Sequence, residues 1–181
     1  RDVPPQSAAV YIAALEAKMA ELGIGQIATL GGRFYGMDRD RRWERIKKAY
    51  DAMVAAEGVK APSALAAITA SYAAGIPDEF VQPAVITDHR GQPVATIEDG
   101  DSVICFNFRA DRARQISHAL VDGQMEQFER RLWPAVHYTC MTQYDIELDA
   151  PVAFHPQNLT NTLGQVLSRQ GLKQLRIAET E

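Results

Sequence analysis

The stretch VICFNF, residues 103–108, decides the fold that we predict from this sequence. It is almost continuously apolar, and a short run of this kind is typical of a parallel strand that is buried on both faces of a sheet. Residues 111–120 follow with the apolar spacing of a helix, so one strand leads directly into one helix. We therefore predict that residues 103–108 form a central strand of a parallel sheet.

The same alternation of helix and strand extends along the rest of the chain. Gly23 and Gly75 stand where two predicted helices should stop, and Asp38 or Asp40 is suited to cap another. Apolar spacing predicts further helices over residues 12–22, 40–53, 63–74 and 158–168, and strands over residues 26–30, 136–144 and 175–178. The proline- and glycine-rich stretch between residues 77 and 101 predicts short strands and turns. The predicted fold is an α/β layered domain with a mostly parallel central sheet flanked by helices, in a single domain over residues 1–181.

Composition and charge restrict the function. Apolar residues make up 46% of the chain and charged residues 23%, which is ordinary for a globular protein. The formal net charge of -4 provides no extended positive field, so we expect neither nucleic acid nor a membrane as a partner. No apolar run approaches the roughly 20 residues that span a bilayer. Cys105 and Cys140 both lie in predicted buried strands, which favours a reduced, cytoplasmic protein.

Arginines follow the ends of two predicted strands. Arg33 comes after one strand and two glycines, and Arg109 comes directly after VICFNF. Because ligands of open parallel sheets bind beyond the carboxyl ends of the strands, we expect these side chains to reach one cleft. Arg39 lies just before a predicted helix, and Arg112 lies near the predicted start of another, where unpaired backbone N–H groups also favour an anion. Forked guanidinium groups suit carboxylates and phosphates, so the pattern predicts a local site for a small ligand bearing both.

The other candidate residues favour simpler roles. Surface arginines are mostly solvated or in weak ion pairs, and we expect this of Arg41, Arg42, Arg45, Arg130 and Arg131. The four histidines show no ligand spacing with one another or with the cysteines, so we predict no metal site in this chain. The sequence contains neither a glycine-rich phosphate loop nor a nucleophile elbow. It therefore predicts anion binding without an evident nucleophile.

Three long blocks carry a family resemblance. At GGRFYGMDRDRRWERIKKAYDAMV (31–54), at CFNFRADRARQI (105–116) and at TQYD (142–145) with PVAF beyond it, the chain closely resembles 2,3-bisphosphoglycerate-independent phosphoglycerate mutases. The opening RDVPP looks like the tail of that family's Gly-Arg-Asp segment, and GLKQLRIAETE looks like the link back to its other domain. Gly36, where the family commonly has alanine, leaves the charged pattern intact. Because the sequence also starts without a methionine, we expect both of its ends to be interrupted.

The resemblance implies a two-domain, monomeric enzyme that interconverts 3-phosphoglycerate and 2-phosphoglycerate in glycolysis. It implies a phosphoserine intermediate and no requirement for 2,3-bisphosphoglycerate. This chain matches the inserted substrate-binding domain, whereas the serine and two divalent metal ions, usually manganese, belong to a phosphatase-like domain with no counterpart here. We therefore expect the fragment alone to be inactive and to bind no metal. The alternative is a stand-alone phosphate- and carboxylate-binding module without catalysis.

The family motif carries its substrate-binding residues over to six positions, namely Arg1, Asp2, Arg33, Arg39, Arg109 and Arg112. The resemblance implies that Arg1 and Asp2 contact the glycerate hydroxyl groups, with Asp2 as the catalytic acid or base. It implies further that Arg33 and Arg39 hold the substrate carboxylate. Arg109 and Arg112 would then hold the phosphoryl group and offset its charge during transfer.

Overall fold

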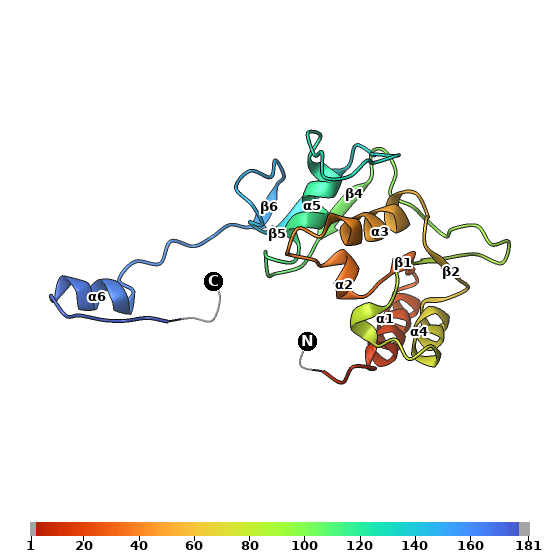
Figure 1. Cartoon of the computed structure of the whole chain (residues 1–181), viewed down its shortest axis with the longest axis horizontal. Coiled ribbons are helices and arrows are strands. Elements are labelled where there is room, and N and C mark those ends of the chain that lie inside the picture. The colour runs from red at the N-terminus through yellow and green to blue at the C-terminus, as the bar shows by residue number, and fades with distance from the viewer. Residues whose placement is uncertain (1–2, 178–181) are drawn as a thin grey trace.

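The computed structural model describes residues 3–177, and these residues form an α/β fold with a parallel three-stranded sheet flanked by helices (Figure 1). The predicted fold class is therefore confirmed. In chain order the elements are α1 (Ala8–Leu22), β1 (Thr29–Leu30), α2 (Arg33–Gly36), α3 (Trp43–Val54), β2 (Val59–Ala61), α4 (Ala64–Ala73), the 3₁₀ turn η1 (Asp78–Phe80), β3 (Ala84–Ile86), β4 (Ser102–Cys105), α5 (Arg114–Val121), β5 (His137–Thr142), β6 (Val152–Phe154) and α6 (Leu163–Arg169).

The described strands form two sheets of three strands each. The first has the order β1-β3-β2, in which β1 runs antiparallel and β2 runs parallel to the central β3. The second has the order β4-β5-β6 and is parallel throughout. In this sheet Val103 lies opposite Tyr138, and Cys105 lies opposite Cys140.

The main core lies between the parallel sheet and the helices α3 and α5. Ile46 and Tyr50 of α3 pack with Ala119 and Leu120 of α5 and with buried side chains of β5, among them Cys140. A smaller core of alanines and Ile86 lies between α4 and the first sheet. The helices α3 and α5 cover the parallel sheet, and each follows a segment that carries predicted site residues, Arg39 before α3 and Arg109 before α5. The core therefore fixes where these two segments meet.

The prediction of a central, doubly buried strand at residues 103–108 is wrong. Only Ser102–Cys105 form the strand β4, which lies at the edge of its sheet, while β5 takes the centre. Val103 and Cys105 face the core, but Ile104, Phe106 and Phe108 are 67%, 75% and 72% exposed. A continuously apolar run does not reveal which of its faces is covered, because strand side chains alternate between the two faces.

The remaining elements differ from prediction mainly at their ends. The helices expected over residues 12–22, 40–53 and 63–74 correspond to α1, α3 and α4, and left-handed glycines follow α1 and α4 at Gly23 (φ 66°) and Gly75 (φ 73°). The helix expected from residue 111 begins at Arg114, because residues 111–113 form a turn. The helix expected from residue 158 begins at Leu163, where Thr162 and Gln165 form a capping box.

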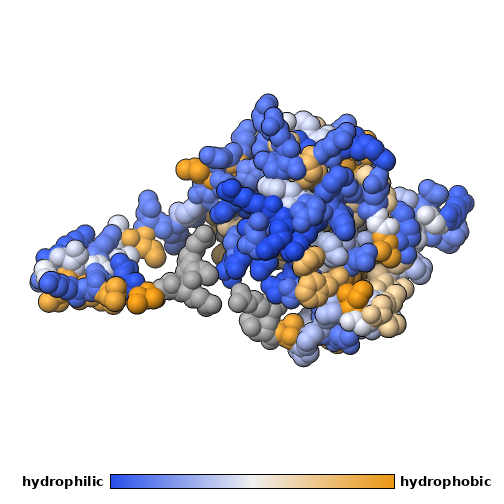
Figure 2. Space-filling model, viewed as in Figure 1, coloured by the Kyte–Doolittle hydropathy of each residue, from blue (hydrophilic) through white to orange (hydrophobic). Residues whose placement is uncertain are grey.

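The C-terminal segment stands apart from the rest of the molecule. An extended connection leads from β6 to α6, which lies away from the two sheets (Figure 1). Its apolar side chains are visible at the surface (Figure 2), and Leu163, Leu175 and Ile177 are strongly exposed. The strand expected over residues 175–178 is not formed at 175–177, and residue 178 lies outside the described part. Among the helices within residues 3–177, none combines the length and apolarity needed to cross a bilayer.

Candidate functional site

A single carboxylate joins two of the predicted arginines. Arg39 lies in the loop between α2 and α3, and Arg109 lies in the segment between β4 and α5. Asp111 accepts a hydrogen bond of 2.8 Å from Arg39 Nη1 through Oδ2, and its Oδ1 lies 3.1 Å from Arg109 Nε. The carboxylate therefore bridges two segments that are far apart in the sequence.

Asp111 is ionised in this arrangement. Its side chain is only 15% exposed, and burial by itself would raise the pKa. The hydrogen bond from Arg39, the charge of Arg109 and the backbone N–H of Arg112 outweigh burial and lower the pKa of Asp111 below its ordinary value. The carboxylate therefore offsets part of the positive charge at this junction.

Arg112 joins the same junction through the backbone. Its Nη1 donates a hydrogen bond of 2.9 Å to the carbonyl of Met37, the C-cap residue of α2. Three of the predicted arginines, Arg39, Arg109 and Arg112, thus meet where the loop at residues 37–42 packs against the segment at residues 109–114. We call this place the arginine junction.

Asp38 holds the loop that carries Arg39. It is only 4% exposed, and its Oδ2 accepts hydrogen bonds from the backbone N–H of Asp40 at 3.0 Å and of Arg42 at 2.9 Å. Burial would raise the pKa of Asp38, but these backbone bonds and the contacts with Gln115 and the Arg42 guanidinium lower it. The prediction that Asp38 or Asp40 caps this helix is wrong, because Arg42 occupies the N-cap position of α3 and no described side chain caps it; Asp38 instead fastens the loop before the helix.

Gln115 is a residue that sequence reasoning missed. This buried side chain of α5 donates to Asp38 Oδ2 at 3.2 Å and accepts at 2.9 Å from the backbone N–H of Arg41. Arg41 has a left-handed backbone (φ 59°), which is uncommon outside glycine. Gln115 therefore locks the loop to α5 in this conformation. Its only sequence signal was its place one turn after Asp111, within the block that carries the resemblance.

Arg33 is held by a different set of contacts. It is the first residue of α2, and its Nη2 lies 3.0 Å from Glu79 Oε1 of η1. The glycine before it, Gly32, has no room for a side chain, because a Cβ would lie 2.2 Å from the carbonyl oxygen of Glu79. The absence of a side chain at Gly32 therefore allows the backbone of η1 to approach closely.

We expected the arginines to meet because they follow strands at the carboxyl edge of one sheet, and this cause is wrong. Arg33 follows β1 and Arg109 follows β4, but these strands belong to different sheets. The arginine junction instead arises from the packing of two loops held by Asp38, Gln115 and Asp111. Arg1 and Asp2, which the resemblance implies as substrate contacts, lie outside the described residues.

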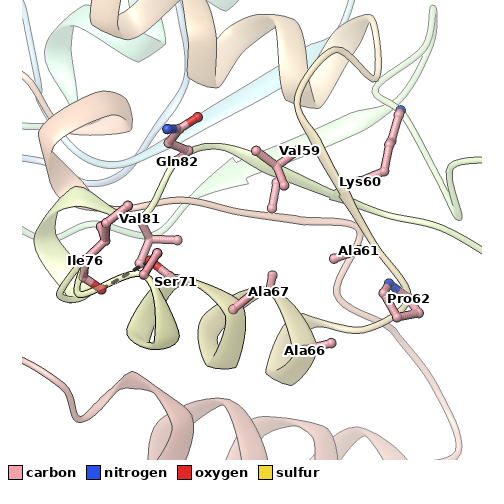
Figure 3. A pocket seen from close by; sticks show the side chains of 13 residues that line it. Val59, Lys60, Ala61, Pro62, Ala66, Ala67, Ser71, Ile76, Val81 and Gln82 are labelled. Atoms are coloured by element: carbon pink, nitrogen blue, oxygen red, sulfur yellow. Dashed lines mark hydrogen bonds between the residues drawn. The ribbon is translucent and has the colours of Figure 1, made fainter.

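Two hollows lie near these elements. A polar one of about 610 Å³ opens beside the junction and is lined by Arg39, Asp111, Arg114, His118 and Asp145, among others. A second one of about 440 Å³ lies between α4 and β2 (Figure 3), and its lining is mostly alanine, valine and isoleucine. The polar hollow is lined by several charged groups that suit an anionic ligand, whereas the lining of the second hollow includes one charged side chain, Lys60. Within residues 3–177, no group of three or more His, Cys, Asp or Glu side chains could hold a metal ion.

Comparison with known proteins places these features in a family. The family model described as the N-terminus of BPG-independent PGAM matches residues 1–146. A 2,3-bisphosphoglycerate-independent phosphoglycerate mutase of Moorella thermoacetica is 58% identical over 184 residues, and one of Desulforudis audaxviator is 56% identical over 182 residues. Both alignments cover 100% of this chain but only 35% and 36% of the relatives. The chain thus spans about a third of the length of these relatives.

A solved structure agrees with this result. The crystal structure of Leishmania mexicana phosphoglycerate mutase at low cobalt concentration superposes with a TM-score of 0.83 at 32% sequence identity. The match covers 94% of this chain and 33% of that chain. Sequence and fold therefore agree on one family.

Proposed function

Since the chain belongs to the family of 2,3-bisphosphoglycerate-independent phosphoglycerate mutases, we propose that it is the substrate-holding part of such an enzyme. The parent would be an isomerase that interconverts 3-phosphoglycerate and 2-phosphoglycerate. The observation that carries this proposal is the arginine junction, where Arg39, Arg109 and Arg112 gather around Asp111 and Met37. A ligand that ends in a carboxylate and a phosphate needs several such groups within its own length.

Each arginine has a proposed role. Arg109 and Arg112 would bind the phosphoryl group and stabilise its charge during transfer, because their guanidinium groups keep their charge at any physiological pH. Arg33 and Arg39 would bind the carboxylate. Arg1 and Asp2 would contact the hydroxyl groups, with Asp2 as the acid or base for the oxygen that loses or gains the phosphoryl group.

The remaining components of the cycle would come from the rest of the parent. As the family resemblance implies, we propose that the two divalent ions and the phosphoryl-accepting serine belong to the phosphatase-like part. The fragment alone would then show no turnover, even with manganese added. We propose a monomeric, cytoplasmic parent that works in glycolysis and needs no 2,3-bisphosphoglycerate.

Steady-state kinetics of the full-length parent test this proposal. Asp2→Asn should lower kcat by about 10²–10⁴-fold with little change in substrate affinity, because it removes a proton acceptor and keeps the size of the side chain. Arg109→Ala should weaken affinity by about 1.5–3 kcal/mol and also lower kcat, because it removes a charge-assisted contact. Arg131→Ala is the matched control, since Arg131 forms an exposed ion pair with Glu57 and should change neither constant.

The result also separates the proposal from its alternative. A full-length protein that binds phosphoglycerate with the same dependence on Arg109 but shows no turnover would favour the anion-binding module. Near-normal turnover of Asp2→Asn would remove the acid–base role from Asp2 and leave it as a hydrogen-bond partner of the substrate.

A further inference from the structure

The short turn η1 contacts two segments that matter for the proposed site. It lies between α4 and β3. On one side it touches residues 31–34, at the entry to α2, which we call the Arg33 loop, and on the other side it touches the N-terminal segment. Residues 3–8 of that segment are described, and they directly follow Arg1 and Asp2. The turn η1 therefore connects the N-terminal segment with the Arg33 loop.

Asp78 anchors the N-terminal segment. Its Oδ2 accepts hydrogen bonds from the backbone N–H of Ser7 at 2.9 Å and of Ala8 at 3.1 Å, and its own N–H donates to the carbonyl of Pro5 at 2.8 Å. The hydroxyl of Tyr72 donates to Asp78 Oδ1 and accepts from the N–H of Ala8. Burial would raise the pKa of Asp78, but these hydrogen bonds lower it, so the carboxylate is ionised.

The rest of η1 anchors the loop of Arg33. Glu79 forms the ion pair with Arg33, and Phe80 packs on Phe34 with ring centroids 5.0 Å apart. The N–H of Gly32 donates at 2.8 Å to the carbonyl of Val81, next to the close approach of Gly32 to Glu79. One turn thus fixes residues 5–8 relative to Arg33 through backbone contacts on both sides.

We propose that Asp78 is a positioning residue for Asp2, holding the segment that follows Asp2 at a fixed place beside the Arg33 loop. The inference rests on the proposed function. Pro5 is three residues from Asp2, and three residues span at most roughly 11 Å, so an anchor there limits where Asp2 can reach. Small displacements of an acid–base group lower turnover while contacts made by other groups to the ligand remain.

The test is a double-mutant cycle on the full-length protein. Asp78→Asn replaces one acceptor oxygen with an amide donor, so it should lower kcat by roughly 10- to 100-fold and change KM less than about twofold. In an Asp2→Asn background, where the group to be positioned is absent, the same change should have almost no further effect on kcat. The matched control is Asp88→Asn, because Asp88 also accepts two backbone N–H bonds, from Arg90 and Gln92, but in an exposed turn. It should leave kcat and KM unchanged.

Other outcomes would contradict either the role of Asp78 or the proposed function. If Asp78→Asn lowers kcat equally in both backgrounds, or not at all, Asp78 does not position Asp2. If Asp78→Asn does not fold, Tyr72→Phe replaces it, because this change removes only one hydroxyl from the anchor. An unchanged kcat for a folded Tyr72→Phe would then overturn the inference. An unmodified parent without mutase turnover would overturn the proposed function itself, and this inference with it.

Discussion

Asp111 and Arg39 lie 72 positions apart in the sequence, yet their side chains form a hydrogen bond of 2.8 Å. The same pattern recurs at Asp38, which reaches Gln115 over 77 positions. In both cases an ionised carboxylate, half-buried at Asp111 and buried at Asp38, gathers donors from segments that only the fold brings together. At the scale of residues, a carboxylate therefore places Arg39 and Arg109, whereas the backbone carbonyl of Met37 holds Arg112.

Asp38 gives a pH-dependent prediction. A lowered folded-state pKa means that its contribution to stability is fully present above the unfolded pKa, near 3.8, and is lost as pH falls through the lower folded pKa. Asp38→Asn should therefore cost about 1.5–3 kcal/mol at pH 7, and the difference from the unmodified chain should shrink below about pH 3.8. Urea unfolding at pH 7 and pH 3 measures it. Asp40→Asn in the same loop, at an exposed ion pair, should cost less than about 1 kcal/mol at either pH.

Gly32 gives a prediction with a control beside it in the chain. Gly32→Ala would place a Cβ 2.2 Å from a backbone oxygen, so η1 and the Arg33 loop must separate. We expect a loss of about 3 kcal/mol or more in the free energy of unfolding. At Gly31 the nearest atom would be 3.4 Å away, so Gly31→Ala should change stability by less than about 1 kcal/mol. Equal effects of the two changes in a chemical melt would mean that η1 does not press on Gly32.

At the scale of elements, β4 shows what one face of a strand contributes. Its inward side chains join the core with α3 and α5, while its outward ones are exposed. Phe108, which follows β4 and is also exposed, meets Phe154 of β6, with ring centroids 6.3 Å apart. The contact joins two exposed rings outside the core. An α/β sheet with one bare face therefore depends on α3 and α5 for its stability.

The same substitution at two positions tests whether the stability of the sheet depends on the face covered by α3 and α5. Ile46 of α3 is fully buried, so Ile46→Val should cost about 0.5–1.5 kcal/mol. Ile104 of β4 is two-thirds exposed, so Ile104→Val should stay within about 0.5 kcal/mol of the unmodified chain. Thermal unfolding of both variants of the chain provides the comparison. A larger loss at Ile104 would show that the outward face of β4 is covered in solution.

The sequence could predict features that depend on the local order of residues. It could not predict features that depend on which distant segments pack against an element. The helical period at Trp43, Ile46 and Tyr50 and the stop at Gly23 are local, and α3 and α1 follow them. The four arginines could also be selected locally, by their places after strands or near helix ends. The edge position of β4, the split into two sheets and the bridging role of Asp111 could not, because each depends on which distant segment lies alongside.

At the scale of the whole molecule, the chain is a body with a projecting arm. The body extends from α1 to β6, and the connection at residues 155–162 has no helix or strand and is mostly exposed before α6 begins (Figure 1). The family model ends at residue 146, within the body. We propose that the arm is the link toward the remainder of the parent.

Limited proteolysis tests this division. A broad-specificity protease should cut first within residues 155–162, because an exposed segment without backbone pairing fits a protease cleft. The fragment that retains α1 to β6 should keep the cooperative thermal transition of the intact chain. The exposed turn at Asp88 should resist longer, since its backbone N–H groups are bonded to that side chain. First cuts inside the body would contradict the division.

The bridge at Asp111 also has an entropic consequence. An unrestrained arginine gives up roughly 2 kcal/mol of rotamer freedom when a ligand immobilises it. Arg39 and Arg109 are already ordered by the carboxylate between them, so much of this loss occurs when the chain folds. The phosphate of a ligand would then replace the Asp111 carboxylate as the anion beside these guanidinium groups, which would hardly move. Calorimetry should accordingly show a more unfavourable binding entropy for Asp111→Ala than for the unmodified protein, whatever happens to the enthalpy.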